Sequence, residues 1–269
     1  MNKPIAVIDS GIGGLTVLYE LQRQLPKEHF IYLGDTLRCP YGSKSEDDVR
    51  QYTWEMVRYL LQYDIKMLVV ACNTATAVAL DELKDHLTIP VVGVVEPGAR
   101  AAIKTTESEH VAIIGTENTI SSQAYETALT AINPSIQTLG VACPQFVPLI
   151  ESGDLISDEA YHIVEQSLTA IKNDPTIDTL ILGCTHYPMI QPLIESVLGD
   201  KITVLSSALE TGSEVSASLA FHELLADDKQ DINHHPVILT TGHLTVLQRI
   251  KDELFHFTSS QVQQVTLNS

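Results

Sequence analysis

Two cysteines occupy equivalent places in two distant parts of the chain. Cys72 follows the apolar run 68–71, and Cys184 follows the run 180–183. Each run is typical of a strand buried on both faces, and a helical pattern follows each cysteine after a few small polar residues. Ligands bind at this edge of open α/β sheets, where the N–H groups of a helix start favour an anion.

Two thiols that face each other across a cleft suit one type of reaction. A thiolate removes a proton from one face of a carbon atom, and a thiol delivers a proton to the opposite face. The result is inversion at that carbon by two-base general acid–base catalysis. Because only the thiolate is a base, one thiol must be ionised while the other stays protonated.

Three further side chains could tune these thiols. Asp9 ends the first expected strand and could reach Cys72. His186 stands two residues after Cys184, and Glu151 could orient its ring. Each also has an ordinary structural interpretation: a turn former for Asp9, a helix-start histidine for His186 and a solvated carboxylate for Glu151.

Hydrogen-bond donors accompany both thiols. Asn73, Thr74 and Thr185 could hold an α-carboxylate, although each could equally cap a helix. The glycine-rich turn 11–14 lacks the spacing of the dinucleotide fingerprint and fits close approach to a small anion. For Cys39 and Cys143 we expect buried, inert thiols.

Strand-like and helical segments alternate along the whole chain, which predicts an α/β fold. Besides the two cysteine strands, the expected strands are 5–8, 30–33, 91–94, 111–116, 202–205, 237–239 and 262–267. The expected helices are 15–25, 45–63, 74–86, 157–172, 208–225 and 244–255. We also expect a break at 96–98, a long irregular stretch at 142–153 and a polar linker at 226–231.

The pattern restarts after residue 98. Residues 111–116 resemble 5–10, and Ser10 precedes Cys72 by 62 positions while Thr116 precedes Cys184 by 68. We therefore expect two pseudo-symmetric lobes, each a largely parallel sheet flanked by helices, with the active site in the cleft between them. The first half has too few elements for a lobe, so we assign residues 1–96 plus 208–269 to lobe one and 97–207 to lobe two.

Composition excludes several classes of protein. A formal net charge of -18 argues against nucleic-acid binding. No run of 18 apolar residues could span a membrane, and the N-terminus lacks the features of a signal peptide, so we expect a cytoplasmic protein. The four cysteines form no C-x-x-C pair, which argues against zinc knuckles and thioredoxin chemistry.

The sequence resembles the glutamate racemases of the cofactor-independent aspartate/glutamate racemase family over essentially its whole length. The matching motifs are Asp-Ser-Gly-x-Gly-Gly-Leu-Thr at 9–16, Gly-Asp at 34–35, Pro-Tyr-Gly at 40–42, Ala-Cys-Asn-Thr-Ala at 71–75, Gly-Thr at 115–116 and Leu-Gly-Cys-Thr-His-Tyr-Pro at 182–188. The resemblance implies interconversion of L- and D-glutamate for peptidoglycan, with neither a cofactor nor a metal ion.

The resemblance also assigns roles to residues. It implies that Cys72 takes the α-proton from D-glutamate and Cys184 from L-glutamate, assisted by Asp9, His186 and Glu151. By the same resemblance, the side-chain carboxylate is bound by Ser10, Pro40, Tyr41 and Gly42. The α-carboxylate is bound by Asn73, Thr74 and Thr185, and Thr116 and Thr119 are further residues of the pocket.

Family members are commonly homodimers, which we expect here too. Some relatives carry an N-terminal extension and need a cell-wall precursor as activator; this sequence lacks that extension, so we expect activity without the activator. Three other interpretations stay open: a racemase for aspartate or another acidic substrate, a non-catalytic amino-acid-binding module, and a metal site built from Cys72, Cys184 and His186.

Overall fold

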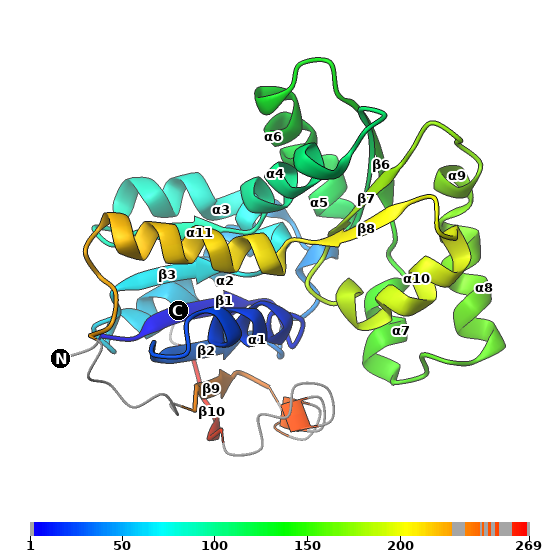
Figure 1. The fold of residues 1–269 in the computed structure, drawn as a ribbon. Coiled ribbons are helices and arrows are strands. Elements are labelled where there is room, and N and C mark those ends of the chain that lie inside the picture. Colours follow the sequence, from blue (N-terminus) through cyan, green and yellow to red (C-terminus); the bar gives the residue numbers. More distant parts are fainter. Residues whose placement is uncertain are drawn as a thin grey trace.

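The protein contains two parallel β-sheets flanked by helices, which confirms the predicted fold class (Figure 1). The computed structural model describes residues 3–227, 235–242, 244, 247–248, 251–252 and 260–267. Within these ranges, one sheet has the strand order β10-β9-β2-β1-β3-β4 and the other the order β6-β5-β7-β8. The strands of the first sheet are β1 (Ile5–Asp9), β2 (Phe30–Gly34), β3 (Met67–Val70), β4 (Val91–Gly93), β9 (Val237–Thr240) and β10 (Val262–Gln264). Those of the second are β5 (His110–Gly115), β6 (Gln137–Ala142), β7 (Thr179–Gly183) and β8 (Thr203–Ser206).

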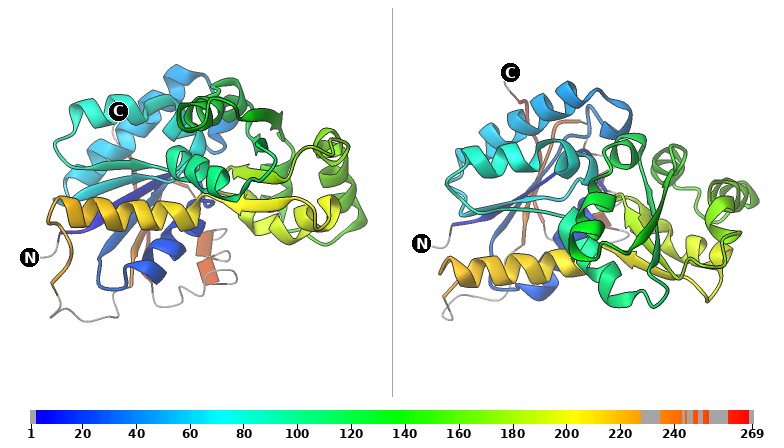
Figure 2. Two further views of the ribbon diagram at one scale, coloured as in Figure 1. Left: turned by 45° about the horizontal axis from the view of Figure 1, so that its top comes forward. Right: turned by 90° about the horizontal axis from the view of Figure 1, so that it is seen from above.

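Helices cover both faces of each sheet, so the central strands are apolar on both sides. In the first sheet, α1 and α11 share one core with the strands, and α2 and α3 share the core on the other face (Figure 2). The helices are α1 (Leu15–Gln24), α2 (Glu46–Leu61), α3 (Asn73–His86), α4 (Val95–Thr105), α5 (Glu117–Ser121), α6 (Ala124–Ile132), α7 (Phe146–Ser152), α8 (Asp158–Ser167), α9 (Thr169–Lys172), α10 (Gln191–Leu198) and α11 (Ala208–Phe221), with short 3₁₀ turns η1 (Tyr41–Ser43) and η2 (Tyr187–Ile190). No helix in the described ranges is both long and apolar enough to cross a bilayer.

The strands that precede Cys72 and Cys184 have equivalent neighbours in their two sheets. β3, which precedes Cys72, pairs in parallel with β1, and β7, which precedes Cys184, pairs in parallel with β5. β1 and β5 are in turn the strands with the similar sequences 5–10 and 111–116. The expected repeat therefore corresponds to matched positions in two sheets.

The C-terminal part of the chain returns to the first sheet, as the shortage of elements in the first half predicted. β9 pairs with β2 and β10 pairs with β9, both in parallel. α11 packs against α1 (Figure 1). The lobe boundaries at 96/97 and 207/208 stay a prediction.

Two expectations about local structure are wrong. Residues 96–98 do not form a break between elements but lie in the first turn of α4. The N–H groups of a first turn have no partner within the helix, so Pro97, which has no N–H group, removes no hydrogen bond there. The stretch 142–153 is not irregular throughout, because α7 occupies 146–152 and ends at Gly153, whose φ of 83° is left-handed.

Smaller differences concern element ends. The helix expected at 157–172 is divided into α8 and α9 at Leu168, and β10 ends at Gln264 rather than at 267. Most of the helix expected at 244–255 and part of the linker at 226–231 lie outside the described residues.

Candidate active site

Cys72 and Cys184 line one small pocket between the two sheets. Its lining comes from the loops after β1, β2, β3, β5 and β7 and from α7. The lining residues are Ser10, Pro40, Tyr41, Gly42, Cys72, Asn73, Thr74, Thr116, Val147, Cys184, Thr185 and His186. The remaining predicted residues, Asp9, Thr119 and Glu151, lie behind this lining in contact with it.

Cys72 is the N-cap of α3. Its sulfur accepts a hydrogen bond from the N–H of Ala75 at 3.4 Å and lies 3.5 Å from the hydroxyl oxygen of Ser10. These two contacts favour a thiolate, but burial and the charge of Asp9 outweigh them and raise the pKa of Cys72 to about 12. Cys72 is therefore a protonated thiol at neutral pH in the free protein.

Asp9 connects the two halves of the pocket. Its carboxylate accepts hydrogen bonds from the N–H of Gly11 at 2.9 Å and from the hydroxyl of Thr185 at 3.1 Å. Helix α1 can approach this carboxylate because Gly14 has no side chain: a Cβ there would lie 2.5 Å from the Cβ of Asp9. Asp9 thus ties the end of β1 to the loop that carries Cys184.

His186 is buried beside Cys184 and forms an ion pair with Glu151, 3.1 Å from its Nε2 atom. Burial alone would lower the pKa of His186, but its contacts with Cys184 and Glu151 prevail and raise it to about 10. The same contact with His186 holds the pKa of Glu151 below its usual value. At neutral pH the ring is therefore a buried imidazolium held by a carboxylate.

The loop after β1 reaches this imidazole because Gly13 has no side chain. A Cβ at Gly13 would lie 2.5 Å from His186 Nδ1 and 2.4 Å from the hydroxyl oxygen of Thr185. Both distances are too short for real atoms, so any larger residue would displace the histidine.

Neutral hydrogen-bonding groups form the rest of the pocket. The hydroxyl of Thr74 lies 2.9 Å from that of Thr116 and 3.1 Å from that of Thr119. Asn73 donates to the hydroxyl of Tyr125 at 2.7 Å, whereas its buried Oδ1 atom has no hydrogen-bond partner in the described part of the chain. The twelve lining residues include no lysine or arginine.

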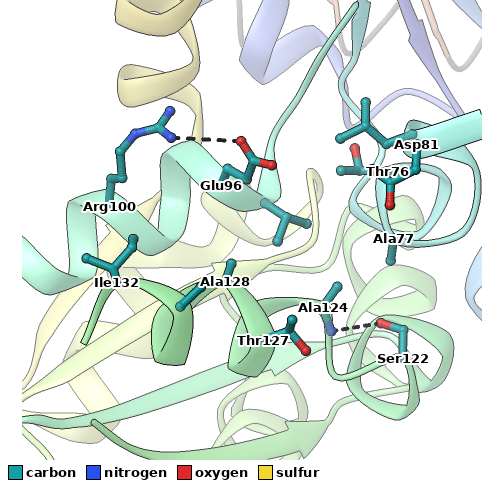
Figure 3. Close-up of a pocket in the computed structure, with 13 residues that line it drawn as sticks. Thr76, Ala77, Asp81, Glu96, Arg100, Ser122, Ala124, Thr127, Ala128 and Ile132 are labelled. Atoms are coloured by element: carbon teal, nitrogen blue, oxygen red, sulfur yellow. Dashed lines mark hydrogen bonds and ion pairs between the residues drawn. The ribbon is translucent and has the colours of Figure 1, made fainter. Parts of the chain in front are cut away.

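The pocket is nearly closed, with a free volume of about 10 Å³. This is room for about one water molecule, so an amino acid enters only when the walls move apart. A wider cavity of about 540 Å³ lies between α3, α4 and α6 (Figure 3). It contains the neighbouring charges of Glu96 and Arg100 but no thiol or imidazole, whereas the smaller pocket contains both kinds of group.

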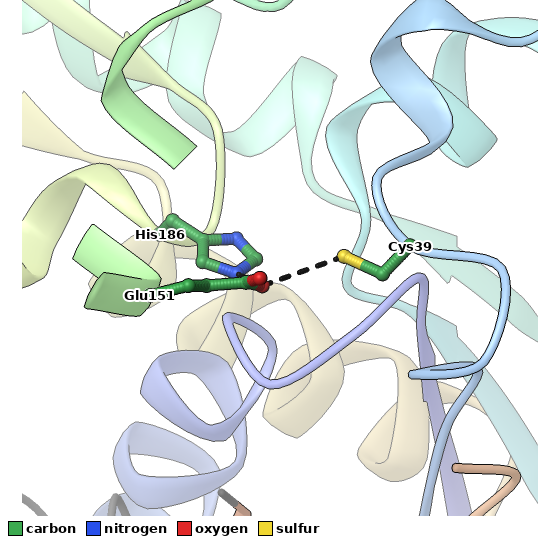
Figure 4. A group of neighbouring side chains, drawn as sticks. All are labelled: Cys39, Glu151 and His186. Atoms are coloured by element: carbon green, nitrogen blue, oxygen red, sulfur yellow. Dashed lines mark hydrogen bonds and ion pairs between the residues drawn. The ribbon is translucent and has the colours of Figure 1, made fainter. Parts of the chain in front are cut away.

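Sequence reasoning missed two features of this region. Val147 lines the pocket from α7, the helix that was expected to be irregular. Cys39, expected to be inert, places its sulfur 3.6 Å from Glu151 Oε1 (Figure 4). Among the described residues, the donor atoms close enough to share a metal ion are those of Cys39, Glu151 and His186, a different set from the metal site considered from the sequence.

Comparison with known proteins agrees with this geometry. The sequence model of the Asp/Glu/Hydantoin racemase family matches residues 5–211. The chain is 51% identical to a glutamate racemase of Oceanobacillus iheyensis over all of this chain and 98% of that protein, and 45% identical to one of Listeria monocytogenes over 99% of both.

Solved structures give the same result. A glutamate racemase isoform from Bacillus anthracis superposes with a TM-score of 0.94 at 42% identity, covering 98% of both chains. A glutamate racemase from Francisella tularensis, solved in complex with D-glutamate, has a TM-score of 0.90 at 30% identity and covers 99% of this chain and 98% of its own. The chain therefore belongs to the Asp/Glu/Hydantoin racemase family, in its glutamate racemase branch.

Proposed function

We propose that this chain interconverts L- and D-glutamate without a cofactor, with Cys72 and Cys184 as the two acid–base groups. The observation that carries the proposal is that two thiols, each at the end of an equivalent strand, line a single pocket. The full-length similarity to glutamate racemases supports the choice of substrate.

The two thiols have different environments, and the two directions of the reaction use them in opposite roles. Cys184 lies beside the His186 imidazolium, whereas burial and the charge of Asp9 raise the pKa of Cys72. With L-glutamate, the Cys184 thiolate takes the α-proton. The electron pair of the broken C–H bond is delocalised into the α-carboxylate, and the thiol of Cys72 then protonates the opposite face of the carbon.

With D-glutamate the roles reverse. Cys72 must then act as the base, and its α3 N-cap contacts with Ala75 and Ser10 support the thiolate during the reaction. Cys184 returns a proton to the other face, and each proton taken from carbon is held by the sulfur that removed it.

The polar lining provides the substrate contacts. We assign the α-carboxylate to Asn73, Thr74 and Thr185, and the side-chain carboxylate to Ser10 and the loop 40–42, as the resemblance implies. Thr116 and Thr119 support the hydroxyl group of Thr74.

The ammonium group of the substrate has a candidate partner as well. The unpaired Oδ1 of Asn73 is a buried acceptor, which is costly until a donor such as an ammonium group reaches it. Because the lining has no lysine or arginine, helix ends and neutral donors must stabilise the charge that develops on the α-carboxylate.

The test is proton exchange in deuterated buffer. We expect purified protein, without any added cofactor, to abolish the circular dichroism of both L- and D-glutamate while deuterium replaces the α-proton in the NMR spectrum. Cys143→Ser, which alters a buried thiol that lines no part of this pocket, is the matched control and should exchange at the wild-type rate. Binding of glutamate without exchange would contradict the proposal and indicate an amino-acid-binding module. Exchange with aspartate but not with glutamate would indicate a racemase that acts on aspartate.

Three further proposals follow from the resemblance. We propose that the chain is a homodimer, which light scattering on the purified protein would test. We propose that it acts in the cytoplasm, in the supply of D-glutamate for peptidoglycan. We also retain the division into lobe one (1–96 and 208–269) and lobe two (97–207), whose relative movement would open the pocket.

A further inference from the structure

Three metal-binding side chains meet beside the pocket, and the proposed racemisation uses only two of them. Cys39 lies in the loop after β2, whereas Glu151 ends α7 and His186 follows β7. The three side chains point toward one another from opposite sides of the gap between the sheets (Figure 4). Their donor atoms, Cys39 Sγ, a carboxylate oxygen of Glu151 and a ring nitrogen of His186, all lie within 4.8 Å of one another.

The spacing of these atoms matches the edges of a zinc tetrahedron. With Zn–S of about 2.3 Å and Zn–N and Zn–O of about 2.0 Å, ideal angles place sulfur and oxygen about 3.5 Å apart and oxygen and nitrogen about 3.3 Å apart. The structure has 3.6 Å between Cys39 Sγ and Glu151 Oε1 and 3.1 Å between Glu151 Oε1 and His186 Nε2. Two of the three edges are thus already formed.

The donor set and its accessibility also fit zinc. A thiolate, an imidazole and a carboxylate are the ligands that zinc takes in proteins, and a thiolate disfavours magnesium and calcium. The Glu151 side chain is 37% exposed and Cys39 is partly exposed, so an ion can enter and a water molecule can complete a fourth position.

We propose that Cys39, Glu151 and His186 form an inhibitory site for a thiophilic divalent cation, with zinc the ion that they fit best. A bound ion takes the Nε2 lone pair of His186, and its own charge replaces that of the two protons that leave. It also joins the loop after β2 to α7, two elements that supply residues 40–42 and Val147 to the lining of the pocket. Zinc binding therefore fixes the His186 ring and holds the pocket closed.

Protons must leave when the ion binds. The Cys39 thiol loses its proton to form the thiolate ligand, and the His186 imidazolium loses one to expose a nitrogen lone pair; both protons pass to solvent.

Cobalt(II) is the probe because its absorption reports a sulfur ligand directly. The purified full-length chain is titrated with Co²⁺ and then with Zn²⁺, which should displace the cobalt. We expect one ion per chain, with the strong near-ultraviolet band of a thiolate–cobalt bond. Cys39→Ser should lose the band and weaken zinc binding at least tenfold, since loss of even a supporting group typically costs 10–100-fold in metal affinity. Cys143→Ser is the matched control and should keep both.

Two results would overturn this inference. One is the absence of a thiolate band in the wild-type protein at saturating cobalt. The other is a band that survives in Cys39→Ser and disappears in Cys184→Ser, which would place the ion on the catalytic thiol. Because these readouts measure binding and not turnover, they stay valid if the proposed racemisation is wrong. Where turnover is measurable, zinc should inhibit the wild type reversibly to chelators, and inhibition of Cys39→Ser, relative to its own zinc-free rate, should need at least tenfold more zinc.

Discussion

Replacing Glu151 by glutamine removes the carboxylate that holds His186 charged while leaving a side chain of the same size. A hydrogen bond to a charged group contributes about 1.5–3 kcal/mol. Because the Glu151 side chain is 37% exposed, water screens part of this, and we take about 1–2 kcal/mol. At 1.36 kcal/mol per pH unit, the variant should lower the pKa of His186 by about 0.7 to 1.5 units from its wild-type value of about 10.

The assay is the pH dependence of kcat/KM for both enantiomers. We expect the alkaline limb of the profile to move toward neutral pH by that amount, so that kcat/KM at pH values above the limb falls about 5- to 30-fold. The fall must be equal in both directions, since the two enantiomers have the same free energy in water. Glu165→Gln, which removes an exposed carboxylate paired with Lys172 on the far side of α8, is the control and should leave the profile unchanged.

The free energy of unfolding tests the ion pair of Glu151 and His186 independently of turnover. A histidine whose pKa is raised by folding stabilises the folded state fully below its ordinary value of 6.5, and this contribution disappears as the pH rises through about 10. Urea unfolding should therefore show Glu151→Gln less stable than the wild type at pH 7, with the difference shrinking toward pH 10. An alkaline limb that does not move, together with a pH-independent stability difference, would refute the assignment of His186 as an imidazolium held by Glu151.

Three other outcomes can be checked with single substitutions. In Cys184→Ser, α-deuterated L-glutamate should show a larger primary kinetic isotope effect than α-deuterated D-glutamate, because proton removal by the weakened base becomes slower. Cys72→Ser should show the reverse. Equal isotope effects for the two enantiomers in both variants would contradict the assignment of the faces. Gly13→Ala should reduce kcat/KM by about 100-fold or more, since its Cβ would lie 2.5 Å from His186 Nδ1 and displace the ring, while near-wild-type kinetics would show that the ring position does not matter. Tyr41→Phe, which removes a buried hydroxyl that donates at 2.5 Å to a carboxylate, should lower the free energy of unfolding by about 1–3 kcal/mol in urea titrations, and an unchanged value would contradict the structural importance of that bond.

The positions of the catalytic strands could be predicted because parallel strands buried on both faces leave unbroken apolar runs in the sequence. The runs before Cys72 and Cys184 gave strand ends within one or two residues, and the two cysteines with the polar residues after them gave six of the twelve residues of the pocket lining. The similarity of 5–10 to 111–116 predicted the two matched sheets, because equivalent strands need equivalent turns.

The sequence misled where proline can occupy a helix. The break expected at 96–98 contains Pro97, and the irregular stretch expected at 142–153 contains Pro148. Each proline lies in the first turn of its helix, α4 or α7, where an N–H group has no partner within the helix. The contact between Cys39 and Glu151 joins residues 112 positions apart, and no local pattern reports such a contact. Only the folded arrangement shows that a cysteine expected to be inert lies against Glu151, the partner of His186.

The return of the C-terminal segment to the first sheet has a consequence for synthesis on the ribosome. The second sheet is complete once β8 ends at Ser206, but β9, which covers the edge of β2, ends only at Thr240. At about 5–20 residues per second, the intervening 34 residues (240 − 206) take about 2–7 s. During that interval β2 has an unpaired edge, and for the first 15 residues (221 − 206) α1 also lacks its complete neighbour α11. The nascent chain is therefore open to aggregation at β2 until its last strands emerge, which makes the C-terminal segment a determinant of yield as well as of the fold.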